Sequence, residues 1–165
     1  NIPNLLRGYA KALPLLDGAD LVLAGYNSNK TSYLTELIDS LGITDNVKWI
    51  GGIHDSDLPA VMGAVKAFVM PSIYEGFGLS VLEAMAVGTP VACSEAPALK
   101  ELTDNAAVYF DTNSPDSISQ AIINVMLDEK LRSELKSKAL KRASEYSWDK
   151  VAESTIELYK AALGN

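Results

Sequence analysis

The sequence has one cysteine, Cys93, and one histidine, His54, among its 165 residues. A lone cysteine cannot form a disulfide within the chain, and this pair of side chains cannot supply the clustered ligands of a zinc site. Cys93 lies in an apolar stretch at residues 90–94, so we expect a small buried side chain and not a reactive thiol. His54 could contact a nucleotide base or phosphate, but its position in a glycine-bearing loop favours a solvated residue.

Long apolar runs and an excess of positive charge are also absent. No apolar run approaches the roughly 20 residues that a membrane-spanning helix requires. The 14 Lys and Arg residues are outnumbered by 21 Asp and Glu, which gives a formal net charge of −7. A nucleic-acid partner requires a basic surface, so nucleic acid is excluded as a partner. For the same reason, this part of the protein is not expected to be the main anchor to an anionic membrane.

The composition that is present suits one globular domain. Hydrophobic residues make up 48% of the chain, enough for a full core at this length. Apolar patterns and turn residues predict helices at 2–16, 31–41, 57–64, 98–102, 117–127, 129–146 and 147–163, and strands at 21–25, 47–50, 67–70, 90–94 and 107–110, with a turn at 26–29. This regular alternation predicts a Rossmann-like α/β fold, with a mostly parallel sheet and helices on both faces.

The most informative stretch is residues 75–79, which follow the predicted strand at 67–70 and open a further helix. Gly76 and Gly78 lack a Cβ, so their backbone can approach a ligand closely. The helix that follows exposes unpaired N–H groups and the positive end of its dipole. Such a turn, at the carboxyl end of a strand, is where folds of this class bind phosphorylated ligands.

Two carboxylates, Glu75 and Glu83, flank this turn and can accept hydrogen bonds from sugar hydroxyls. We expect Ser80 to cap the helix, with Glu83 three residues later completing a capping box. Gly88 stands where the end of that helix is expected, because Pro90 cannot continue it.

Residues 71–91 closely resemble the donor-site signature of retaining nucleotide-sugar glycosyltransferases with the two-domain GT-B fold, the glycosyl transferases group 1. The signature has two glutamates separated by seven residues, as Glu75 and Glu83 are here. The resemblance extends from about Asn4 to the last predicted helix, so residues 1–165 resemble the C-terminal, donor-binding domain of such an enzyme. Ser80 departs from the proline that is frequent in the family, although both residues suit a helix start.

The resemblance implies a role for each residue of the turn. Glu75 would face the donor sugar near its anomeric centre, and Glu83 would bind the ribose hydroxyls. The backbone of Gly76, Phe77 and Gly78 would contact sugar hydroxyls, and Leu79 and Ser80 would offer N–H groups to the diphosphate. Gly52 and Ile53, after the strand at 47–50, are implied contacts of the nucleotide base.

The resemblance implies transfer of a hexose from a nucleotide diphosphate sugar to a hydroxyl acceptor with retention of configuration, in polysaccharide or lipopolysaccharide synthesis. It favours front-face attack, with a covalent bond to Glu75 as the minor alternative. No metal or other cofactor is expected, and the carboxylates of Asp55 and Asp57 fit an acidic helix start better than a magnesium site. The nucleotide, the hexose and the acceptor stay open.

Parts of the family pattern have no match in this chain. The family carries an arginine and a lysine on a first strand and its following loop, whereas Arg7 and Lys11 lie on the next predicted helix. We therefore expect a fragment that lacks this strand and the N-terminal acceptor-binding domain, with a gap beside the strand at 21–25 that a neighbouring chain could fill. The expected location is the cytoplasm, with any peripheral contact to the inner membrane made through the missing domain.

Other functions stay open at this point. One is a non-catalytic nucleotide-sugar-binding module of the same fold, and another is a nucleotide-sugar epimerase, for which His54 is the only candidate acid/base imidazole. A phosphorylase should carry extra lysines for pyridoxal phosphate, and no such motif is visible. A nicotinamide dehydrogenase is disfavoured because no predicted strand ends in the three-glycine fingerprint. In the last predicted helix, Trp148 and Tyr159 are expected to be packing residues.

Overall fold

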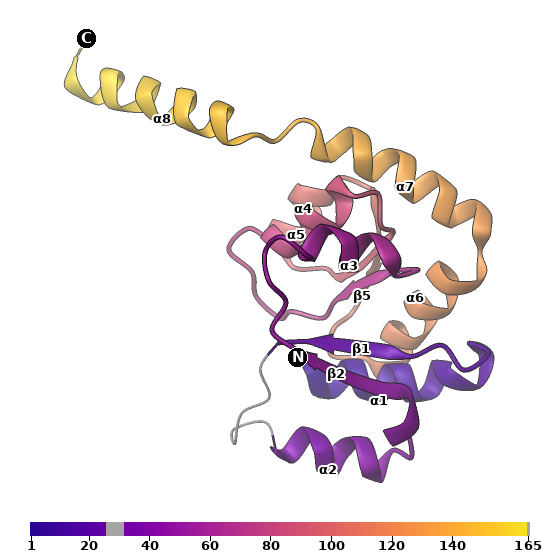
Figure 1. Cartoon of the computed structure of the whole chain (residues 1–165). Coiled ribbons are helices and arrows are strands. Elements are labelled where there is room, and N and C mark those ends of the chain that lie inside the picture. The colour runs from indigo at the N-terminus through magenta and orange to yellow at the C-terminus, as the bar shows by residue number, and fades with distance from the viewer. Residues whose placement is uncertain (26–31, 165) are drawn as a thin grey trace.

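The computed structural model describes residues 1–25 and 32–164 (Figure 1). The turn predicted at 26–29 lies outside these residues. The helices are α1 (Ile2–Ala12), α2 (Ser32–Ser40), α3 (Leu58–Ala64), α4 (Leu79–Ala86), α5 (Pro97–Thr103), α6 (Pro115–Leu127), α7 (Glu129–Ala143) and α8 (Trp148–Leu163), with 3₁₀ turns at Leu13–Leu15 and Thr44–Asn46. The strands are β1 (Leu21–Ala24), β2 (Val47–Gly51), β3 (Phe68–Met70), β4 (Val91–Ser94) and β5 (Ala107–Phe110). The predicted element order is confirmed.

The five strands form two separate sheets in the described part of the chain. β1 pairs with β2, and β3, β4 and β5 pair in that order. All three strand pairs are parallel, as the alternation of strands and helices predicts. β4 is the central strand of the larger sheet, and each of its four residues is buried.

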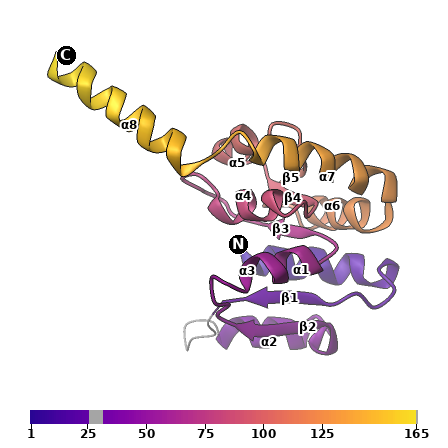
Figure 2. The same cartoon turned by 45° about the horizontal axis from the view of Figure 1, so that its top comes forward.

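The division between the sheets lies beside β1 and β3. Among the residues described, β1 pairs through its ladder with β2 alone, and β3 with β4 alone, so each has one open edge. Both views show the β1–β2 pair set apart from the larger sheet (Figures 1 and 2). This break in strand pairing lies beside β1, where the sequence predicted a gap; a missing strand as its cause stays a prediction.

Helices cover both faces of the larger sheet. Side chains alternate along β4, so successive residues of this strand pack against helices on opposite faces. Ala92 packs with residues of α1 and α6 on one face. Val91 and Cys93 pack with residues of α4, α5 and α7 on the other. On the first face α1 and α6 approach closely, since a Cβ on Gly8 would lie 2.6 Å from Ile118 Cγ2.

Helix α8 leaves the rest of the molecule (Figure 1). It contains no buried residue, although its start is as predicted: the Ser147 side chain accepts a hydrogen bond from the Lys150 N–H. Trp148 is 78% exposed and Tyr159 is 67% exposed. Nothing in the described part of this chain covers α8, so the packing expected of these two aromatic residues is not made within it. Their packing against a further domain stays a prediction.

None of the helices within residues 1–25 and 32–164 combines the length and the apolar character needed to cross a membrane.

Candidate functional site

The centre of the site is the turn between β3 and α4. Gly78 is the N-cap of α4 and has φ of +99°, a left-handed conformation that disfavours any side chain. A Cβ at Gly78 would also lie 2.5 Å from Leu99 Cδ2 and 3.3 Å from Leu102 Cδ2 of α5. The conformation and the close packing both require glycine here, and together they fix where α4 begins.

The predicted capping box at this helix start is wrong. Gly78, and not Ser80, is the N-cap, and no side chain caps the helix. The Gly78 carbonyl accepts hydrogen bonds from the N–H groups of Val81 and Leu82. The N–H groups of Leu79 and Ser80, in the first turn, have no acceptor within the helix and are available to a ligand.

Glu83 lies two residues further into α4 than predicted, because Gly78 and not Ser80 is the N-cap. Its side chain is exposed. It lines a hollow beside α3 together with Ala86 and Val87. The helix ends as predicted: Gly88 has φ of +76°, and the Gly88 and Thr89 N–H groups donate to the Met85 and Ala84 carbonyls.

The Glu75 carboxylate is oriented by two serines. Glu75 is half-buried, and Ser72 Oγ donates a hydrogen bond to its Oε1 at 2.7 Å. The backbone carbonyl of Ser72 in turn accepts a hydrogen bond from Ser94 Oγ at 2.6 Å, and Ser94 is 1% exposed. Ser94 ends β4, the neighbour of β3, so this contact comes from adjacent strands that end at the same edge of the sheet.

Neither Ser72 nor Ser94 was predicted as a site residue from the sequence. Ser94 could have been predicted, because it ends a strand that is expected to lie in the same parallel sheet as the strand before Glu75. No comparable signal marked Ser72.

A hollow of about 400 Å³ opens beside Glu83, between α3 and α4. It is lined by Asp55, Leu58, Pro59, Met62, Glu83, Ala86 and Val87. Apart from Glu83, none of these residues was a predicted ligand contact. The lining combines apolar side chains with two carboxylates, Asp55 and Glu83, which suits a ligand with an apolar ring and polar groups.

The two predicted base contacts lie next to this hollow in the chain. Gly52 and Ile53 follow β2 and precede Asp55. Gly52 is exposed and Ile53 is half-buried, and neither lines the hollow. His54 is an exposed loop residue, as favoured from the sequence, with its Nδ1 2.9 Å from Ser56 Oγ.

Large apolar side chains surround the glycine turn at the surface. Tyr74 is 86% exposed, Ile73 66% and Leu79 53%. Phe77 is less exposed, at 43%, because its ring contacts Tyr146. A group of such residues around one turn is more than scattered surface exposure and is typical of a surface that meets another body.

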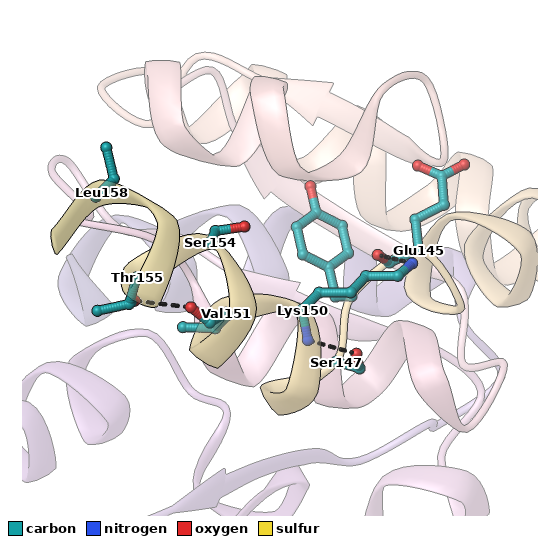
Figure 3. A pocket seen from close by; sticks show the side chains of 8 residues that line it. Glu145, Ser147, Lys150, Val151, Ser154, Thr155 and Leu158 are labelled. Atoms are coloured by element: carbon teal, nitrogen blue, oxygen red, sulfur yellow. Dashed lines mark hydrogen bonds between the residues drawn. The ribbon is translucent and has the colours of Figure 1, made fainter. Parts of the chain in front are cut away.

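A second hollow, of about 290 Å³, lies at the corner between α7 and α8 and contains none of the predicted ligand residues (Figure 3). Figure 3 shows Lys150, Thr155 and Leu158 of α8 around it, with Glu145 on the side of α7. Lys150 Nζ donates a hydrogen bond to the Glu145 carbonyl at 2.8 Å, which ties the start of α8 to the end of α7.

Two observations concern metal and thiol chemistry. Among the residues that the structure describes, no group of three or more His, Cys, Asp or Glu side chains is placed to hold a metal ion. Cys93 is fully buried, as predicted, and burial raises the pKa of its thiol to about 12. The thiol is therefore protonated at neutral pH and is a packing group.

Comparison with known proteins identifies the family of this chain. The sequence profile of the glycosyl transferases group 1 matches residues 1–142, and the chain belongs to this family. The chain is 35% identical to O-antigen chain mannosyltransferase B of Escherichia coli over 162 residues, which cover 97% of this chain and 42% of that protein. It is 32% identical to D-inositol 3-phosphate glycosyltransferase of Salinispora arenicola over 142 residues, which cover 85% of this chain and 32% of that protein.

Solved structures give the same fold. Sucrose-phosphate synthase from Thermosynechococcus elongatus superposes with a TM-score of 0.87 at 22% identity, over 99% of this chain and 43% of that one. HepE from Anabaena, in complex with UDP and glucose, superposes with a TM-score of 0.84 at 23% identity, over 96% of this chain and 44% of that one. The fold is thus that of one half of the GT-B glycosyltransferases, and the chain spans less than half the length of these relatives.

Proposed function

We propose that this chain is the donor-binding half of a retaining hexosyltransferase, which uses a nucleotide diphosphate sugar to glycosylate a hydroxyl acceptor in polysaccharide or lipopolysaccharide synthesis. The observation that carries the proposal is the turn at residues 75–78, where an oriented carboxylate precedes an uncapped helix start. Relatives named as mannosyltransferases, and a neighbour solved with UDP-glucose, support this class of donor.

The diphosphate would lie at the start of α4. The N–H groups of Leu79 and Ser80 have no acceptor within the helix, and the helix dipole favours an anion there. As the bond to the sugar breaks, negative charge grows on the departing diphosphate, and these fixed donors stabilise it. The structure supports this part of the assignment through the absence of any side-chain cap on α4.

The sugar would lie over the backbone of Gly76, Phe77 and Gly78, with Glu75 near its anomeric carbon. Ser72 donates to one oxygen of Glu75, which fixes the carboxylate and leaves its other oxygen for a sugar hydroxyl. We favour front-face attack, with the acceptor proton passing to the leaving phosphate oxygen and with Glu75 stabilising positive charge on the ring.

The nucleoside would occupy the hollow between α3 and α4. Glu83 would accept hydrogen bonds from the ribose hydroxyls, and the base would lie against Leu58 and Met62, close to Gly52 and Ile53. The acceptor would be bound by a further domain, because the chain spans 42% of the mannosyltransferase it resembles. The exposed side chains of Ile73 and Tyr74 would face that domain across the cleft. The open edges of β1 and β3 would be paired by a strand from outside residues 1–165 or from a neighbouring chain.

The first test is a calorimetric titration of the natural full-length protein with UDP-, GDP- and ADP-hexoses. We expect one donor to bind, and Glu83→Ala to weaken that binding by about 1–3 kcal/mol, the cost of losing hydrogen bonds to a charged group. Glu157→Ala, which removes an exposed glutamate from α8, is the matched control and should leave binding unchanged. Absence of binding by all three donors would overturn the proposal in favour of a module without this ligand.

The second test addresses the reaction. Glu75→Gln keeps the shape of the side chain and removes its charge, so kcat should fall by more than tenfold while donor binding changes little. The configuration of the product, read by nuclear magnetic resonance during turnover, should match that of the donor. A product of inverted configuration would contradict the retaining assignment.

A further inference from the structure

The ring of Phe77 contacts a residue that follows α7. The ring centroids of Phe77 and Tyr146 are 5.8 Å apart, and the ring planes meet at 74°. This edge-to-face arrangement is attractive, because the positive edge of one ring meets the negative face of the other. A residue of the glycine turn is therefore held by a residue close to the C-terminal helix.

Tyr146 is itself fixed by Arg142. The Arg142 Cζ lies 5.0 Å from the centroid of the Tyr146 ring. The same guanidinium donates from Nε to the Leu102 carbonyl and from Nη2 to the Glu101 carbonyl, both at 2.9 Å. These carbonyls belong to the last turn of α5, where acceptors have no partner within the helix. Arg142 thus joins the end of α7 to the end of α5.

Helix α5 reaches the glycine turn from its other side. Leu99 and Leu102 pack so closely on Gly78 that no Cβ fits between them. The turn is therefore held at two adjacent residues, with α5 against Gly78 and Tyr146 against Phe77. Arg142 ties these two supports to each other.

We propose that Tyr146 is a positioning residue for the donor: through the Phe77 ring it holds the backbone of residues 76–78 in the conformation that binds the nucleotide sugar. This inference rests on the proposed function of the turn. Tyr146 does not touch the donor, and its effect passes through Phe77. Phe77 is 43% exposed, and the edge-to-face contact with Tyr146 restricts the orientation of its ring.

The test is a double-mutant cycle in the natural full-length protein, with the dissociation constant of the donor as its readout. We expect Tyr146→Ala to weaken donor binding by about two- to tenfold, the range that one aromatic pair contributes. Tyr146→Phe keeps the ring and should bind as the wild type does. Phe77→Ala should weaken binding similarly, and the double variant should bind no worse than Phe77→Ala alone, because both substitutions remove one contact.

Two controls separate positioning from a general loss of stability. Tyr33→Ala removes an aromatic residue of α2 that is 52% exposed, and it should not change donor binding. The melting temperature of every variant is measured beside its affinity, and Tyr146→Leu replaces Tyr146→Ala if the alanine variant does not fold. A loss of affinity in a variant that melts with the wild type supports positioning.

The outcomes distinguish the positioning role of Tyr146 from the proposed function of the turn. Tyr146→Ala with wild-type affinity, or losses that add in the double variant, would overturn the positioning role and leave the proposed function intact. A wild-type protein that binds no nucleotide sugar would overturn both. Non-additive losses, with binding preserved in Tyr146→Phe, would establish the positioning role.

Discussion

Helices α4 and α8 are both well marked in the sequence, yet they have opposite surroundings. α4 has Val81, Ala84 and Met85 completely buried, whereas α8 has no buried residue. α8 also has the stronger local signals, with a serine N-cap that accepts a hydrogen bond and a left-handed glycine, Gly164, at its end. Local signals therefore determine where a helix forms, and packing determines which helix stabilises the fold.

The largest expected effect comes from truncating one apolar residue in each helix. Met85→Ala should lower the free energy of unfolding by about 2–5 kcal/mol, because Met85 is fully buried and its loss leaves a cavity. Leu158→Ala, at a residue that is 70% exposed, should change it by less than about 0.5 kcal/mol. Denaturant unfolding of both variants measures the difference, and equal losses would show that α8 packs on the rest of the chain in solution.

The next effect concerns the glycine at one end of each helix. Gly78→Ala should cost about 1–3 kcal/mol from overpacking against Leu99, in addition to the strain of its left-handed backbone. Gly164→Ala meets open space, so it should cost only the backbone strain of about 1–2 kcal/mol. Thermal unfolding compares the two. If Gly164→Ala lowered the melting temperature as much as Gly78→Ala, close packing would not be the reason for Gly78.

The buried thiol beside α4 should make stability depend on pH. The pKa of Cys93 is raised to about 12 in the folded protein, above its usual value of 9.0, so the unfolded state loses the thiol proton first as the pH rises. The contribution of this thiol to the free energy of unfolding is fully present below about pH 9. Above that pH it should decrease by at most about 1.4 kcal/mol per pH unit, toward pH 12. Unfolding is measured between pH 8 and 10 in the wild type and in Cys93→Ala. Identical slopes would contradict the prediction.

The smallest effect is local. Ser147→Ala removes the cap of α8 and should destabilise that helix by about 1 kcal/mol. Ser80→Ala should have almost no effect on α4, where Ser80 makes no capping bond. Amide hydrogen exchange within each helix measures these changes separately, because α8 has no buried residue and we expect it to open independently of α4. Faster exchange in α4 for Ser80→Ala would show that the Ser80 side chain caps this helix in solution, contrary to the structure.

Much of this fold could be predicted because its signals are local. The strand at 107–110 has the predicted bounds, and Gly88 ends α4 as expected. The start of α4 was misplaced by two residues, since serine and glycine are both common N-caps and only the packing of Gly78 against Leu99 decides between them.

The site was predicted less completely than the fold. The placement of Glu75 and Glu83 beside one turn followed from their spacing, but the partners of that turn did not. Ser94 and Tyr146 reach this part of the chain through tertiary contacts, and no periodic pattern in a single sequence reports such contacts. For a related reason the sequence did not show that Trp148 is exposed within this chain: an aromatic residue carries no local sign of which surface covers it.

The open edges of β1 and β3 have a practical consequence for handling the chain. An unpaired strand edge is a template for pairing between copies, and this molecule has such an edge on each of its two sheets. Lateral growth into aggregates is therefore the expected failure of a concentrated preparation of residues 1–165. The net charge of −7 opposes this growth by repulsion between copies, and added salt should screen the repulsion and promote precipitation.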